Sequence, residues 1–155
     1  MNAGQNPTIS VAMCTYNGER FLGAQLESIA AQDRAPDELV ICDDRSSDAC
    51  PEIIKEFAHR AAFPVQLVVN AENLGSTRNF EKAISLCQSE IVALADQDDI
   101  WYRHKLERIE KAFLRSSAIV AVFSDADLID NDSRLLGPRL WKAFSFDAAD
   151  QRQFS

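Results

Sequence analysis

Short apolar runs that alternate with stretches of helical periodicity constrain the fold of this chain more than any other feature. Apolar runs over residues 8–14, 38–42, 65–69, 91–95 and 119–123 predict five strands. Between the runs, apolar residues recur at helical spacing. These helical faces comprise Leu22, Leu26 and Ile29, then Ile53, Ile54, Phe57, Ala58 and Ala61, then Phe80, Ala83, Ile84 and Cys87, then Leu106, Ile109 and Phe113. The alternation predicts an α/β fold, with a mostly parallel, Rossmann-like sheet and helices on both faces.

Polar side chains follow several of these apolar runs at the point where each predicted strand ends. Tyr16 follows the first run, Asp44 the second, and Asp96 and Asp98 the fourth. The carboxyl ends of parallel strands lie at one edge of a sheet, and ligands of such folds bind in the crevice there. We therefore expect these four side chains to lie close together.

Three carboxylates, Asp96, Asp98 and Asp99, stand within four positions at the end of the fourth run. Like charges this close raise one another's pKa unless a cation or a donor lies among them. If the strand geometry continues, Asp96 and Asp98 point to the same side, because side chains alternate between faces. Two hard oxygen ligands predict a site for Mg²⁺ or Mn²⁺, which completes its shell with water and substrate phosphates. The alternative is that Asp98 or Asp99 caps a helix that begins near Trp101.

The composition is that of a globular domain of 155 residues, with 46% hydrophobic residues and a net charge of −8. A negative balance argues against general nucleic-acid binding, which depends on an excess of lysine and arginine. The four cysteines form no Cys-x-x-Cys pair, which favours free thiols in a reducing compartment. No apolar run reaches the length that spans a membrane, so we expect no transmembrane segment.

Carboxylates around a polar ligand, together with a metal, suggest that the ligand is a nucleoside diphosphate bound as its metal complex. In this hypothesis Tyr16 stacks on the base, Asp44 accepts hydrogen bonds from base N–H groups, and Arg78 reaches the base or a phosphate. The simpler interpretations are a half-buried tyrosine, a helix-capping aspartate and a solvated arginine. The chain has neither a P-loop nor a Gly-x-Gly-x-x-Gly motif after the first strand, which weakens the P-loop NTPase and dehydrogenase interpretations.

Four motifs give the chain a family resemblance. Residues 9–18, 40–48, 73–79 and 96–101 occur in the order and setting seen in family 2 glycosyltransferases of the GT-A fold. The chain resembles bacterial members that build surface polysaccharides, including rhamnosyltransferases that use dTDP-rhamnose. The resemblance implies inverting transfer of a sugar from a nucleotide donor, either dTDP-rhamnose or a UDP-hexose, to a glycan or lipid-linked acceptor. It also implies a nucleotide-sugar-binding domain over residues 8–130, after a flexible start at residues 1–7.

The resemblance also implies roles for individual residues. Tyr16 is similar to the residue that packs on the base, and Asp44 to the one that bonds the base edge. Arg78 resembles a donor-pocket arginine, Asp96 the acid near the ribose, and Asp98 the metal-binding acid, which would hold Mn²⁺ or Mg²⁺. Thr15 and Asn17 belong to the first motif and are predicted to bind the donor. Asp99 is read as a helix cap or as a group that supports the metal site.

Inversion in a single step requires a general base on the acceptor side. The family's motif for that base is not found, so residues 131–155 are predicted to begin an incomplete acceptor-side region. Asp125 and Asp127 are candidate acids near the site, or else they cap a strand end. Two alternatives stay open, a sugar nucleotidyltransferase and a non-catalytic nucleotide- or metal-binding domain. The expected location is the cytoplasm, or the cytoplasmic face of the inner membrane with peripheral contact through the acceptor.

Overall fold

The computed structural model describes residues 6–146. The predicted flexible start at residues 1–7 and the end of the predicted acceptor-side region therefore lie partly outside the described residues. The chain divides into two compact units between Ser117 and Ala118. Within the described range no helix is both long and apolar enough to cross a membrane.

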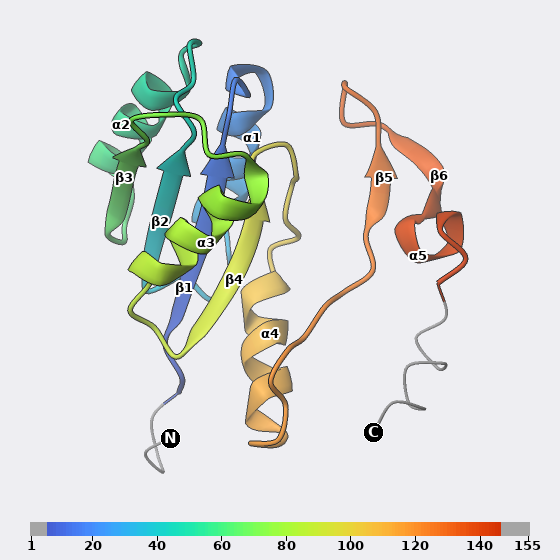
Figure 1. Cartoon of the computed structure of the whole chain (residues 1–155). Helices are drawn as coiled ribbons and strands as arrows, with labels where there is room; N and C mark the ends of the chain where they lie inside the picture. Colours follow the sequence, from blue (N-terminus) through green and yellow to red (C-terminus); the bar gives the residue numbers. More distant parts are fainter. Residues whose placement is uncertain (1–5, 147–155) are drawn as a thin grey trace. The chain divides into compact units, whose positions relative to one another are not determined.

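Four parallel strands form the sheet of the first unit, in the order β3-β2-β1-β4 (Figure 1). They are β1 (Ile9–Thr15), β2 (Glu38–Asp43), β3 (Val65–Val69) and β4 (Ile91–Asp96). Cys14 of β1 lies opposite Cys42 of β2 and Asp96 of β4. The carboxyl ends of these three strands therefore reach the same edge of the sheet. The four strands match the first four predicted ones, and the predicted parallel α/β fold is confirmed.

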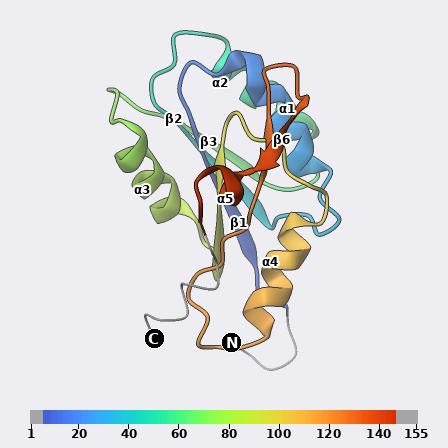
Figure 2. The same ribbon diagram turned by 90° about the vertical axis from the view of Figure 1, so that its right-hand side faces the viewer.

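Helices cover both faces of this sheet, as predicted. The main core lies between the sheet and α1 (Glu19–Ala30), α2 (Cys50–Arg60) and α4 (Lys105–Leu114), whereas α3 (Ser76–Leu86) packs on the opposite face with a smaller core. Figure 2 shows α3 on one side of the sheet and α1 on the other. Strand β1 faces both cores, with Val11 and Met13 in the larger and Ala12 in the smaller. Such two-sided burial explains the continuous apolar run in its sequence.

The buried face of α3 differs from the predicted one. Asn79 and Ala83 are buried, whereas Ile84 is 41% exposed. The Asn79 side chain donates a hydrogen bond to the backbone oxygen of Cys42, 2.8 Å away, which turns a polar residue toward the sheet. The helix is rotated accordingly, and Ile84 lies at the margin of the contact. Periodicity of apolar residues could not reveal this, because a buried asparagine is polar in any hydrophobicity pattern.

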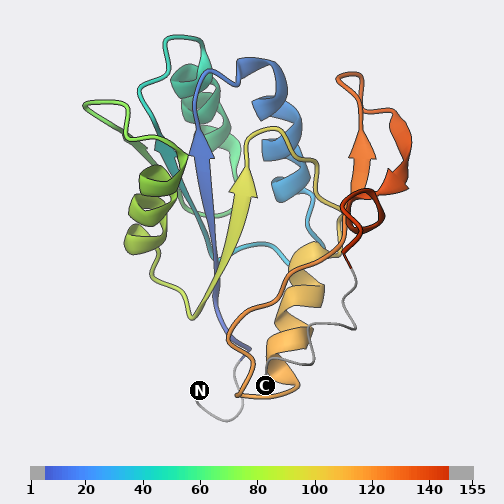
Figure 3. The ribbon, with the colours of Figure 1, turned by 45° about the vertical axis from the view of Figure 1, so that its right-hand side comes forward.

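The second unit contains an antiparallel hairpin of β5 (Asp127–Ile129) and β6 (Leu135–Arg139), followed by the short helix α5 (Leu140–Ala143), as Figure 3 shows. In the turn, one Asp130 carboxylate oxygen accepts hydrogen bonds from the backbone N–H groups of Asp132 and Arg134.

The prediction of a strand at residues 119–123 is wrong. Among the described residues this run pairs with no strand, and Val120 is 91% exposed. An apolar run forms a strand only where a neighbouring strand offers its backbone groups. The Phe123 ring instead packs against the rings of Trp141 and Phe146, with centroids 6.1 and 5.9 Å away.

Candidate functional site

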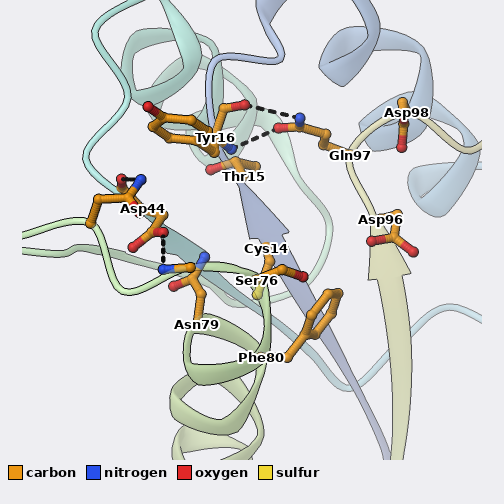
Figure 4. Close-up of a pocket in the computed structure, with 12 residues that line it drawn as sticks. Cys14, Thr15, Tyr16, Asp44, Ser76, Asn79, Phe80, Asp96, Gln97 and Asp98 are labelled. Carbon is orange, nitrogen blue, oxygen red and sulfur yellow. Dashed lines mark hydrogen bonds between the residues drawn. The ribbon is translucent and has the colours of Figure 1, made fainter.

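A cavity of about 450 Å³ opens at the carboxyl ends of the strands of the first unit. Its walls come from the residues that follow β1, β2 and β4 and from the start of α3 (Figure 4). The structure thus brings Tyr16, Asp44, Asp96 and Asp98 to one place, as the positions of the strand ends predicted. The lining residues are Cys14, Thr15, Tyr16, Asp44, Asn73, Gly75, Ser76, Asn79, Phe80, Asp96, Gln97 and Asp98.

Two of the predicted donor-site residues do not line this cavity. Asn17 lies in a left-handed conformation with a φ of 48°. Its side-chain oxygen accepts a hydrogen bond from the backbone N–H of Ser47, 2.8 Å away. Arg78 is exposed near the start of α3 and is not among the lining residues. Thr15 does line the cavity, but its hydroxyl is buried and donates to Asp43 over 2.7 Å.

Asp44 organises the loop between β3 and α3. Its Oδ1 accepts hydrogen bonds from the Leu74 N–H and the Asn70 amide, at 2.7 and 2.9 Å, and its Oδ2 accepts one from the Gly75 N–H at 2.8 Å. Burial raises the pKa of Asp44, but these hydrogen bonds outweigh it and hold the pKa below the usual aspartate value. The carboxylate therefore stays ionised while it holds the loop against the cavity.

A buried hydrogen-bond network extends from Asp44 into the protein. The Asn70 amide nitrogen also donates to the Asn79 side-chain oxygen over 2.8 Å, and the Lys82 ammonium donates to the Asn70 oxygen over 2.7 Å. Both asparagines are buried. Sequence reasoning missed this network, because the partners lie on β2, α3 and the loop between β3 and α3. The one local signal was Gly75, whose φ of 78° allows the loop to turn toward Asp44.

The loop between β1 and α1 is held through its backbone N–H groups. Consecutive N–H groups of this loop donate to side chains from other loops or from α2, and the pairs are Tyr16 with Gln97, Asn17 with Ser46, Gly18 with Cys50, and Glu19 with Asp48. The motif at residues 40–48 thus has a structural task besides any role in binding. It orders the loop that presents Tyr16, whose side chain is half exposed at the cavity.

The acidic segment after β4 departs from the predicted geometry in two ways. The strand ends at Asp96, and Gln97 and Asp98 form a turn, so strand alternation does not orient Asp98. Both carboxylates nevertheless line the cavity. Asp99 does not cap a helix, because α4 begins only at Lys105. Trp101, which lies between Asp99 and Lys105 in the chain, is buried in the main core.

Negative charges outnumber positive charges around this segment. Burial, and after it the charge of Asp98, raises the pKa of Asp96, while Lys105 opposes the rise. Burial also raises the pKa of Asp99, again against the effect of Lys105. The Lys105 ammonium lies 4.3 Å from the centre of the Trp101 ring. Lys105 thus interacts with two of the three carboxylates of this segment, Asp99 and Asp96.

This donor set fits a hard divalent cation. Among residues 6–146 no three His, Cys, Asp or Glu side chains form a ready metal cage. Mg²⁺ and Mn²⁺ are commonly bound by one or two carboxylates, with water and substrate phosphates as the remaining ligands. Asp98 would supply a carboxylate to the ion, whose charge would also offset the repulsion between Asp98 and Asp96.

The other candidate acids pair with an arginine, and the cysteine thiols are free. Asp125 and Asp127 belong to the second unit, where both pair with Arg139 at 3.1 and 3.3 Å. All four cysteines are free, as predicted. Cys14 lines the cavity, but burial, followed by the charges of Cys42, Asp96 and Asp44, raises the pKa of its thiol to about 12.

Comparison with known proteins decides the family. Residues 10–154 match the sequence model of glycosyl transferase family 2. The chain belongs to glycosyl transferase family 2. This is the family that the four motifs resemble.

Relatives of this family 2 chain include the uncharacterized glycosyltransferase alr2836 of Nostoc sp., which is 33% identical over 85% of this chain and 42% of the relative. The UDP-Glc:alpha-D-GlcNAc-diphosphoundecaprenol beta-1,3-glucosyltransferase WfgD of Escherichia coli is 30% identical over 81% of this chain and 48% of its own length. The chain therefore spans less than half the length of these relatives.

Among solved structures, the mannosyltransferase PcManGT of Pyrobaculum calidifontis in complex with GDP-Man and Mn²⁺ superposes with a TM-score of 0.67 and 25% identity. The superposition covers 82% of this glycosyltransferase chain and 37% of the mannosyltransferase. The fold of the first unit is thus the GT-A fold.

Proposed function

We propose that this chain is the donor-binding part of an inverting, metal-dependent glycosyltransferase that uses a nucleoside-diphosphate sugar. One observation carries the proposal. Tyr16 and Asp44 lie on one side of a single cavity, and Asp96 and Asp98 lie on the other (Figure 4). A base can occupy the first side while a ribose and a diphosphate extend toward the second.

Each side chain has a task in this arrangement. The half-exposed Tyr16 ring stacks on the base. Asp96 accepts hydrogen bonds from ribose hydroxyls, and Asp98 holds Mn²⁺ or Mg²⁺. When bound, the metal stabilises the negative charge that grows on the departing diphosphate. The presence of Mn²⁺ with GDP-Man in the mannosyltransferase supports this assignment.

The hydrogen bonds of Asp44 favour a uracil or thymine base. A carboxylate offers about four acceptor positions, and three are taken by Asn70, Leu74 and Gly75. The pairing edge of uracil or thymine has a single N–H, which the free position of Oδ2 can accept. Guanine presents two adjacent N–H donors, and Oδ1, already filled, cannot serve the second. The proposed donor is therefore dTDP-rhamnose or a UDP-hexose.

The proposed acceptor is a glycan or a lipid-linked sugar in cell-surface polysaccharide synthesis, at the cytoplasmic face of the inner membrane. The E. coli relative, whose name specifies a diphosphoundecaprenol-linked acceptor, supports this choice. Inversion needs a base that removes the proton of the acceptor hydroxyl. Among residues 6–146 we assign no side chain to that step, and turnover is proposed for a protein that includes an acceptor side.

Calorimetric titration with UDP, dTDP and GDP, each with and without Mn²⁺, tests the proposal. We expect Mn²⁺ to tighten UDP binding by about tenfold or more, the equivalent of about 1.4 kcal/mol, in the wild type but not in Asp98→Ala. Asp132→Ala serves as the control, because Asp132 is an exposed residue of the hairpin turn.

Three outcomes count against specific parts of the proposal. Absence of nucleotide binding contradicts the donor site. If the affinity for UDP is the same with and without Mn²⁺ and is unchanged by Asp98→Ala, the metal assignment is contradicted. GDP binding as tight as UDP binding contradicts the role given to Asp44.

A further inference from the structure

The pairing between β1 and β4 ends just before the cavity. The last pair in register is Cys14 with Asp96. Beyond it, the Tyr16 backbone would have no partner on this side, because the chain turns away after Asp96. The side chain of Gln97 takes the place of that missing partner.

The Gln97 amide bonds both polar groups of the Tyr16 backbone (Figure 4). Its oxygen accepts from the Tyr16 N–H over 2.8 Å, and its nitrogen donates to the Tyr16 carbonyl over 3.1 Å. A primary amide has the same donor and acceptor as a peptide group. It therefore continues the ladder by one step and joins the turn that bears Asp98 to the loop that bears Tyr16.

Gly18 leaves room for this contact. A Cβ atom at position 18 would lie 2.2 Å from the Gln97 Cδ and 2.3 Å from its Oε1. The Gly18 backbone has an ordinary negative φ of −115°, so backbone conformation does not demand a glycine here. Glycine is required here because any larger residue at position 18 would displace the amide of Gln97.

We propose that Gln97, the residue between the two acids, is a positioning residue that couples the base side of the cavity to the metal side. The inference rests on the proposed function, since it concerns the same cavity. Gln97 itself need not touch the ligand. By bonding the Tyr16 backbone, it fixes the distance between the ring that stacks on the base and the carboxylate that holds the metal. A ligand that spans both sides benefits, and a ligand that occupies only one does not.

The test compares a ligand that does not reach the metal with one that does. Uridine extends from the base side to the ribose contact at Asp96 but lacks the phosphates that approach the metal at Asp98, whereas UDP with Mn²⁺ spans the cavity. We expect Gln97→Ala to weaken calorimetric binding of UDP with Mn²⁺ by about tenfold, the effect of roughly one net hydrogen bond. Uridine binding should weaken by less than about threefold. Gln88→Ala is the control, because Gln88 is exposed and lies at the opposite end of β4.

A second variant tests the contact itself. Gly18→Ala should displace the Gln97 amide and reproduce the Gln97→Ala pattern. The double variant should then bind UDP with Mn²⁺ no more weakly than Gln97→Ala alone, because the displaced amide is already gone. Independent, additive losses in the double variant would overturn the role of Gly18 in this coupling.

The outcomes separate this inference from the proposed function. A wild-type chain that binds no UDP overturns the proposed function and the inference with it. Wild-type binding that Gln97→Ala leaves intact overturns the inference alone. Equal losses for uridine and for UDP with Mn²⁺, together with a lower melting temperature, show a purely structural role and also overturn it.

Discussion

Replacing Asp44 by asparagine tests how the cavity wall is built. The carboxylate is 3% exposed and accepts hydrogen bonds from Asn70, Leu74 and Gly75. Asparagine can keep its oxygen at the Oδ1 position, where Asn70 and Leu74 donate. Its NH₂ group then replaces Oδ2 and meets the Gly75 N–H, so two donors face each other.

The expected cost follows from that mismatch. One hydrogen bond to a charged acceptor is lost and a part-buried N–H is left without a partner, which together should lower the free energy of unfolding by about 2–3 kcal/mol. Asp44→Ala removes the acceptor for all three donors and should cost more. As a control, Asp33→Asn removes only an exposed ion pair with Arg103, for which we expect less than about 1 kcal/mol.

Urea unfolding followed by circular dichroism measures these differences, and pH supplies a second check. The pKa of Asp44 is lower in the folded chain than its usual value of about 3.9. Its stabilisation is therefore fully present above that value and is lost as pH falls through the lower, folded-state pKa. The difference between wild type and Asp44→Asn should narrow in that acidic range. For Asp44→Asn, a loss below about 0.5 kcal/mol at pH 7 would refute the reasoning, because a lost hydrogen bond to a charged acceptor and a part-buried N–H without a partner should together cost more.

Two further predictions concern single side chains at the cavity. Tyr16→Ala should weaken UDP binding by about tenfold, since stacking of an aromatic ring on a base contributes about 1–3 kcal/mol. Tyr102→Ala, which alters an exposed ring outside the cavity lining, should change the calorimetric affinity for UDP little. Equal losses of affinity in the two variants would count against stacking by Tyr16. Cys14 should resist iodoacetamide at pH 8 in the folded protein, because a thiol whose pKa is about 12 holds almost no thiolate there. Mass spectrometry should find Cys14 modified in urea but not in buffer, and rapid labelling of the folded chain would show that the thiol is more accessible than its burial indicates.

The parts of the fold that sequence could predict are those with a repeating apolar pattern. The runs of β1 and β2 are apolar because both faces of the sheet are covered there. The ends of β1, β2 and β4 then place Tyr16, Asp44, Asp96 and Asp98 at one edge. The run at residues 119–123 has the same composition but no neighbouring strand among the described residues. An apolar run shows which residues a strand could bury, but the strand forms only where a second segment pairs with its backbone.

The contacts that shape the cavity could not be predicted in this way. The tasks of Gln97 and Asn79 come from hydrogen bonds to Tyr16 and Cys42, residues that are remote in the chain. A polar residue in a loop gives no sign of its partner. The motif resemblance gave no sign that the Asn17 side chain accepts a hydrogen bond from the backbone of Ser47 in the neighbouring loop, and the donor-binding role of Asn17 stays a prediction.

The loop between β1 and α1 has one more consequence. In many nucleotide-binding folds, free N–H groups at the start of the helix after the first strand receive a phosphate. Here the N–H groups of Tyr16, Asn17, Gly18 and Glu19 already donate to side chains, and those of Leu74 and Gly75 donate to Asp44. These backbone donors are not available to an anion. Under the proposed function, a cation held by Asp98 would supply the diphosphate with positive charge that these backbone groups do not.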